Sequence, residues 1–306
     1  MATTTAWQRT DDRSAAGGAS AKAPRRTLGR FARRLPARLL TALLLVVVIY
    51  PLVWLFLGSV KSQADYLNRP AFSLPAHWMW GNYRAAWVTG DLGIYIRNSV
   101  AAVLPALALV IVLGSAAGFA LQLMRWRLSR PTMLLFLAGI MVPTQMILLP
   151  LFTIYYQAGL TGTLWPLIIT YTATGLPLTV FMLATYFRAV PHEVIEAAAI
   201  DGAGIFRIFF SVAFPMVRNA ILTVALVQFF FMWNDLLIAL TFTNSNSLRT
   251  VQVGLLNFTG EFGSIQYGPL FAAICITVFG TLILFLALNQ KVMKGLTGGA
   301  VKGLRN

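Results

Sequence analysis

Six long runs of apolar residues divide the chain, and the segments between them hold most of its charge. A helix needs about 20 mostly apolar residues to cross the roughly 30 Å hydrocarbon core of a bilayer. Each run satisfies this length, so the pattern predicts an all-α polytopic membrane protein with six transmembrane helices. We expect the helices over about 39–60, 98–121, 133–156, 164–187, 216–240 and 269–288.

The composition agrees with a membrane location. Hydrophobic residues make up 58% of the 306 residues and charged residues 11%, whereas soluble domains have about 45–50% and 25%. The first apolar run exceeds the roughly 7–15 apolar residues of a secretory signal peptide. We therefore interpret it as an uncleaved first helix.

The basic residues indicate an orientation. The formal net charge is +15, and Lys and Arg concentrate in the cytoplasmic segments of membrane proteins. If the N-terminus is cytoplasmic, the basic residues left on the outer side are Lys61, Arg69, Arg84, Arg97 and Arg249. All other Lys and Arg residues would then lie on the cytoplasmic side. This asymmetry predicts a multi-pass membrane protein with both termini cytoplasmic, and it explains the charge without a nucleic-acid partner.

The outer segment 61–97 contains several prolines and lacks a hydrophobic period, which predicts a structured loop rather than a helix. Its Trp78, Trp80 and Trp87 are expected at the level of the lipid headgroups.

The chemistry of an enzyme is missing from the sequence. No Gly-Lys dipeptide occurs, so no phosphate-binding P-loop is expected. His77 and His192 are far apart and should lie on opposite sides of the membrane, which excludes a shared metal site. We predict no catalytic residue, no metal ligand and no cofactor in this chain, so energy for any work that the protein does must come from elsewhere.

The segment 188–215, between the fourth and fifth apolar runs, predicts two short helices meeting at a corner. Pro191 suits a first helical turn, and Glu193 would lie near the positive end of the helix dipole. The alanines at 197–199 favour helix and leave a smooth surface that a partner can approach closely. Gly202 then allows the chain to turn.

This segment resembles the EAA loop of bacterial ABC-importer permeases. Glu196-Ala197-Ala198 is followed by Gly202 at the spacing of that family. Val212, Phe214 and Pro215 stand where the family has Ile-x-Leu-Pro. The two departures replace one apolar residue with another.

Further resemblance lies outside the loop. Trp233-Asn234-Asp235 is similar to the Trp-Asn-Asp of maltose-type permeases, and 294–303 is similar to their C-terminal segment. The likeness extends from about Leu39 to Gly303. The chain is thus identified as a member of the carbohydrate-uptake group of ABC-importer permeases.

The resemblance implies a type I ABC importer permease fold and several partners. A second homologous permease would complete a heterodimer, an extracytoplasmic solute-binding protein would deliver substrate, and two ATPase subunits would bind ATP and Mg. Glu196 is the best candidate for a charged contact with an ATPase, the alternative being a solvated helix surface. The coupling residues carried over are Glu196, Ala197, Ala198, Asp201, Gly202 and Pro215.

We expect four regions in the chain. A basic cytoplasmic tail occupies 1–38 and includes the start of the first span. The first transmembrane helix and the external loop follow at 39–93. The transmembrane core spans 94–290, with the EAA loop at 188–215, and a cytoplasmic tail occupies 291–306.

Polar residues within the spans are candidates for the pathway or its gate. Asp235 is an acidic residue within a predicted span, and such residues are functional candidates. Asn234 and Asp235 either tie their span to a neighbouring helix or line the pathway, and Tyr171 and Gln145 either face a water-filled cavity or join helices. Gly114 and Gly118 favour close helix packing.

Two other transport functions are alternatives, a glycerol-3-phosphate importer and a secondary transporter. Glycerol-3-phosphate importers share these motifs, so the substrate is either a sugar or a phosphate-bearing molecule. A secondary transporter commonly shows inverted repeats and carboxylates at the midplane, but no repeat is visible here. A non-transporting scaffold would not need a docking loop.

Overall fold

The computed structural model describes residues 26–124, 126–259 and 265–302, with side chains described over the part from 36 to 288. The chain forms two compact units, 1–52 and 53–306. Of the tail predicted at 1–38, residues 1–25 lie outside the described residues. From Arg26 it is already helix, because α1 (Arg26–Ser59) begins well before the first apolar run.

The first unit contains, within its described residues, the first part of α1. Its sequence from Leu39 to Ile49 is apolar on all sides of the helix. A helix of this kind is expected where all faces meet lipid or other apolar helices.

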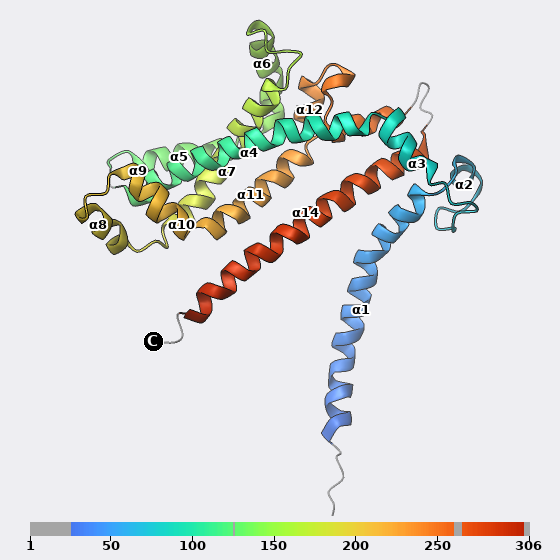
Figure 1. Ribbon diagram of the computed structural model, residues 1–306, viewed down its shortest axis with the longest axis horizontal. Helices are drawn as coiled ribbons and strands as arrows, with labels where there is room; N and C mark the ends of the chain where they lie inside the picture. Colours follow the sequence, from blue (N-terminus) through green and yellow to red (C-terminus); the bar gives the residue numbers. More distant parts are fainter. Residues whose placement is uncertain (1–25, 125, 260–264, 303–306) are drawn as a thin grey trace, which may run out of the picture. The chain divides into compact units, whose positions relative to one another are not determined.

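The second unit is helical throughout its named elements (Figure 1). The long helices are α4 (Leu92–Leu123), α7 (Trp165–Phe187), α11 (Arg218–Trp233) and α14 (Tyr267–Lys302). The shorter helices and helical turns are α2 (Gln63–Asn68), α3 (Gly81–Arg84), η1 (Ala85–Thr89), α5 (Ser129–Ile140), α6 (Thr144–Gln157), α8 (His192–Ile200), α9 (Ile205–Ile208), η2 (Phe209–Ala213), α10 (Phe214–Met216), α12 (Leu237–Phe242), η3 (Asn246–Leu248), α13 (Val251–Gly254) and η4 (Leu255–Phe258).

Helices α4 and α7 pack against each other along much of their length, and α11 contacts both. Two glycines of α4 permit this approach. A β-carbon on Gly118 would lie 2.9 Å from the backbone nitrogen of Ala184, and one on Gly114 would collide with the Thr179 side chain. The packing role predicted for these glycines is confirmed.

The number of straight membrane helices differs from the expected six. Within the residues that the structure describes, four helices are long and apolar enough to span a bilayer, at 36–59, 92–123, 165–187 and 267–288. Two further candidates are bent pairs, and counting each pair as one span brings the total to six. The all-α membrane fold is therefore confirmed, but the third and fifth runs do not form single helices.

The third predicted span breaks into α5 and α6, whose axes differ by 94°. Pro143 accounts for the break, because proline lacks a backbone N–H and disfavours helical backbone at the preceding residue, here Val142. The fifth prediction, 216–240, was wrong in its bounds. Helix α11 ends at Trp233, and a bend of 79° separates it from the helical segment Ile205–Met216.

The outer segment contains helices that its composition did not predict. Helix α2 begins with a capping box, in which the Ser62 side chain accepts from the Asp65 N–H and the Asp65 side chain accepts from the Ser62 N–H. Such reciprocal bonds stabilise a short helix. The expectation of a loop holds for the region around 69–80, whereas both its flanks are helical.

Candidate functional site

The corner predicted between the fourth and fifth runs is present. Helix α8 follows Pro191, and Gly202 terminates it with φ of +79° in the left-handed region. The Gly202 N–H donates to Ala199 O and the Ala203 N–H to Ala198 O, both at 3.0 Å. These two bonds form the Schellman ending of a helix, in which glycine meets no Cβ penalty.

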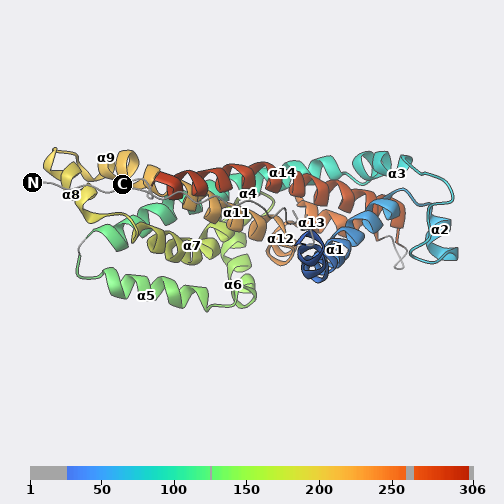
Figure 2. The same ribbon diagram turned by 90° about the horizontal axis from the view of Figure 1, so that it is seen from below.

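The second arm of the corner is anchored to the bundle. Ile208 and Phe209 are buried, and the Phe209 ring centroid lies 5.2 Å from that of Phe119 on α4. Phe119 also meets Phe187 at the end of α7, at 5.9 Å. The corner is thereby packed against the ends of two core helices, which lie beside it at one end of the second unit (Figure 2).

The predicted coupling residues do not all face outward. Glu196, Ala197, Asp201, Gly202 and Pro215 are exposed, but Ala198 is half-buried against the cluster around Phe209. The alanine run is therefore not a uniform contact surface, because one of its members fills the interior side of α8. Pro215 lies in α10, just before the 79° bend into α11.

Apolar side chains at the corner are exposed in a way that the motif did not predict. Ile200 is 86% exposed, Phe206 77% and Phe210 60%. The second arm is rich in Ile and Phe, but the spacing of these residues does not distinguish the buried Ile208 and Phe209 from the exposed Phe206 and Phe210. These three residues lie between the predicted spans 164–187 and 216–240. Large exposed apolar residues in such a segment indicate a surface for a partner.

A cavity of about 500 Å³ lies between α5, α6, α7, α11 and α12. Three of the four candidate pathway residues line it, namely Gln145, Tyr171 and Asp235. Asn234 is not among the lining residues. Its Nδ2 donates to Phe230 O at 3.1 Å, at the end of α11.

Tyr171 and Asp235 form the polar centre of this cavity. The Tyr171 hydroxyl donates to Asp235 Oδ2 at 3.0 Å. The same oxygen accepts from the Ala239 N–H at 3.0 Å, and Oδ1 accepts from the Ile238 N–H at 3.4 Å. Asp235 therefore caps α12 and ties it to α7, which agrees with the first interpretation of this residue, and it also lines the cavity.

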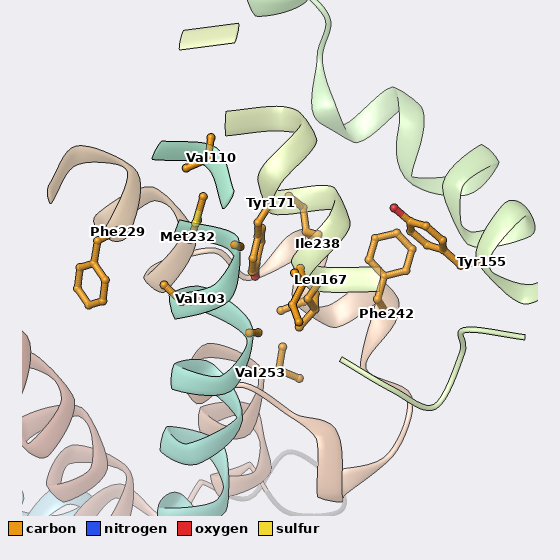
Figure 3. Packing of buried hydrophobic residues seen from close by; sticks show 14 residues of the cluster. Val103, Val110, Tyr155, Leu167, Tyr171, Phe229, Met232, Ile238, Phe242 and Val253 are labelled. Carbon is orange, nitrogen blue, oxygen red and sulfur yellow. The ribbon is translucent and has the colours of Figure 1, made fainter. Parts of the chain in front are cut away.

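Apolar packing supports the side of the cavity around Tyr171 (Figure 3). Leu167, Tyr171 and Ile238 are buried in one cluster, and the rings of Tyr155 and Phe242 meet edge to face at 5.3 Å. Tyr171 is 3% exposed. A buried phenol held in this way has a defined position, which a site that discriminates between ligands requires.

Gln228 is a lining residue that the sequence did not single out. It is buried on α11, and its Nε2 donates to Gly175 O of α7 at 3.1 Å. A β-carbon on Gly175 would lie 2.9 Å from Gln228 Oε1, so the glycine leaves room for the amide. The signal that could have identified Gln228 in the sequence was its polar amide within an apolar run.

Comparison with known proteins gives consistent results. The family described as "Binding-protein-dependent transport system inner membrane component" matches residues 110–290. The diacetylchitobiose uptake system permease protein NgcG of Streptomyces coelicolor is 36% identical, over 84% of this chain and 85% of its own. The melibiose/raffinose/stachyose import permease protein MelC of Bacillus subtilis is 31% identical, over 90% of this chain and 100% of its own.

A solved structure shares the fold. The crystal structure of a bacterial ABC transporter involved in the import of the acidic polysaccharide alginate contains a chain that aligns with a TM-score of 0.73. The alignment covers 86% of this chain and 97% of that one, at 18% identity.

Proposed function

Because this chain belongs to the family of binding-protein-dependent transport system inner-membrane components, we propose that it is the permease subunit of a bacterial ABC importer for a sugar. It would form half of the transmembrane pathway. The observation that carries the proposal is the similarity, over most of the chain, to permeases named for uptake of diacetylchitobiose and of melibiose, raffinose and stachyose.

The cavity favours a sugar over glycerol-3-phosphate. Asp235, Tyr171 and Gln145 offer a carboxylate, a phenol and an amide, which are groups that bond to hydroxyls. No Lys or Arg is among the described residues that line the cavity. A phosphate would therefore meet a carboxylate with no compensating cation. We propose that this cavity is part of the sugar pathway, with Asp235 near its gate.

The corner at α8 and α9 is the proposed contact for an ATPase. Glu196, Ala197, Asp201 and Gly202 would face the partner, with Ile200 and Phe206 adding exposed apolar area. Phe209 packs on Phe119, so a displacement of the corner would be transmitted to α4 and α7. Packed side chains transmit such displacements because protein interiors are close-packed. Ala198 would support this lever from within, and the exposed Pro215 would lie at its junction with α11.

The remaining partners follow from the same proposal. A second permease would supply the other half of the pathway, two ATPases would bind ATP and Mg, and a solute-binding protein would deliver the sugar outside. This chain itself would hold no cofactor. The corner would lie on the cytoplasmic face together with both termini, in keeping with the distribution of Lys and Arg.

Purification and reconstitution test the proposal. The tagged chain should bring down a second permease and an ATPase. In liposomes with the solute-binding protein, this complex should hydrolyse ATP faster when the cognate oligosaccharide is added. Transport by the chain alone, without an ATPase, would overturn the proposal. Binding of glycerol-3-phosphate rather than oligosaccharides by the solute-binding protein would overturn only the substrate class.

A further inference from the structure

A second concavity, of about 720 Å³, lies where α4 ends, α5 begins and α7 ends. Two arginines from separate elements line it, Arg130 in the first turn of α5 and Arg188 directly after α7. The end of α4, the start of α5 and the end of α7 lie at the same end of the second unit as α8 and α9 (Figures 1 and 2). None of the described residues that line the concavity also lines the cavity that contains Tyr171 and Asp235, so the two are separate.

The charge of this concavity is uncompensated. In the described part of the chain, none of the residues that line it is acidic. Among the described residues, neither Arg130 nor Arg188 forms an ion pair or a side-chain hydrogen bond. Both are exposed. Two arginines that share one hollow repel each other, so an anion placed between them is favourable.

The rest of the lining is amphipathic. Trp126 is 41% exposed, and its Nε1 donates to Ala120 O at 3.0 Å near the end of α4. Tryptophan prefers the boundary between hydrocarbon and headgroups. Met133 and Leu134 complete the apolar side of the concavity.

From this hollow an apolar surface continues along α5. No residue of this helix is buried, and Leu134 and Leu135 are 65% and 72% exposed. A ligand that places an anionic group between the arginines and extends alkyl chains over α5 would cover both surfaces. Basic pockets between membrane helices on the cytoplasmic side bind the headgroups of anionic lipids.

We propose that this concavity is a binding site for an anionic phospholipid, with its phosphate between Arg130 and Arg188 and its acyl chains on α5. An acidic segment of a partner protein fits less well, because it would leave the apolar side chains of α5 beside the site uncovered. A free phosphate would use the arginines but leave the same apolar surface exposed.

Photochemical labelling of the assembled importer in phosphatidylcholine nanodiscs tests the proposal. The probe is a phosphatidylglycerol with a photoreactive acyl chain, and the readout is labelling of peptides from 121–135. Unlabelled phosphatidylglycerol should compete, whereas phosphatidylcholine and inorganic phosphate should not. Each arginine near an anionic lipid contributes about 1 kcal/mol, so Arg130→Gln with Arg188→Gln should weaken binding of the probe about 30-fold and lower labelling accordingly.

Two matched variants serve as controls. Arg127→Gln removes a neighbouring charge that does not line the concavity and should leave labelling unchanged. Arg130→Lys with Arg188→Lys keeps both charges and should retain most of it. Equal competition by phosphatidylcholine would show a lipid surface without preference for anions. Competition by inorganic phosphate would show a free-anion site, and absence of labelling in the assembled importer would show that a protein covers the site. Each of these results overturns the proposal.

Discussion

One oxygen of Asp235 joins two elements of the bundle, because Oδ2 accepts from the Tyr171 hydroxyl on α7 and from the Ala239 N–H in α12, both at 3.0 Å. Tyr171 is almost fully buried. This carboxylate, at the edge of the proposed pathway, therefore adds a polar link between α12 and α7 to the apolar packing of Ile238 in the cluster with Leu167.

The Tyr171–Asp235 pair should show energetic coupling. Tyr171→Phe removes the donor, and Asp235→Ala removes the acceptor together with the cap of α12. Asp235→Ala leaves the buried Tyr171 hydroxyl unpaired, which costs about 1–3 kcal/mol, and Tyr171→Phe takes one donor from the carboxylate. Each change should therefore lower the thermal stability of the purified complex. Residues that share a hydrogen bond are coupled by about 0.5–3 kcal/mol, so the double variant should lose less than the sum. Asn234→Ala is the control, because the Asn234 side chain bonds to Phe230 O of α11. Additive losses of thermal stability for the Tyr171 and Asp235 variants would contradict the coupling.

Gly202 should be required for its backbone conformation. Its φ is +79°, and no heavy atom lies within 4 Å of an added β-carbon. A residue with a Cβ pays about 1–2 kcal/mol in the left-handed region, but asparagine tolerates it better. Gly202→Val should reduce substrate-stimulated ATP hydrolysis more than Gly202→Asn does. The matched control is Gly204→Val, where φ is −68° and space is also open. Equal losses for valine and asparagine at position 202 would point to a contact that excludes any side chain.

The two glycines Gly118 and Gly280 should respond differently to alanine. Both lie within long helices, so alanine improves helix propensity at each by about 1 kcal/mol. At Gly118, however, the new methyl group would press on the backbone of α7 at Ala184, and overpacking costs about 1–3 kcal/mol. A β-carbon added at Gly280 would have no heavy atom within 4 Å beyond the backbone of its own helix turn. Thermal unfolding of the two variants should give a lower midpoint for Gly118→Ala than for Gly280→Ala. A midpoint for Gly118→Ala equal to that of Gly280→Ala would mean that α4 and α7 can separate at low cost.

The sequence predicted local features better than long-range ones. Apolar length was sufficient for α4, α7 and α14, and the motif around Gly202 was sufficient for the corner, because both depend on neighbouring residues. The break at Pro143 was marked by the proline itself, but a continuous apolar run obscured it. The division of the chain into four regions, with bounds at 38, 93 and 290, stays a prediction.

Burial was the quantity that the sequence left open. Ala198 differs from Ala197 only in the side of α8 on which it lies, and that side is set by contacts with residues far away in the chain. The same holds for Gln228, whose partner Gly175 is 53 positions away. Asp235 was expected either as a tie or as a lining residue. Only the arrangement of α7, α11 and α12 shows that one carboxylate does both.

The proposed orientation can be tested with single cysteines. Ala76 and Ala189 are exposed, the first in the outer segment and the second between α7 and α8. If the corner is cytoplasmic, a membrane-impermeant maleimide added to intact cells should label Ala76→Cys but not Ala189→Cys. Opening the cells should make both react. The native Cys275 is 4% exposed and should stay unlabelled in the parent protein, which provides the background. Labelling of Ala189→Cys in intact cells would place the corner outside, where no ATP-driven partner acts, and would contradict both the orientation and the coupling role of Glu196.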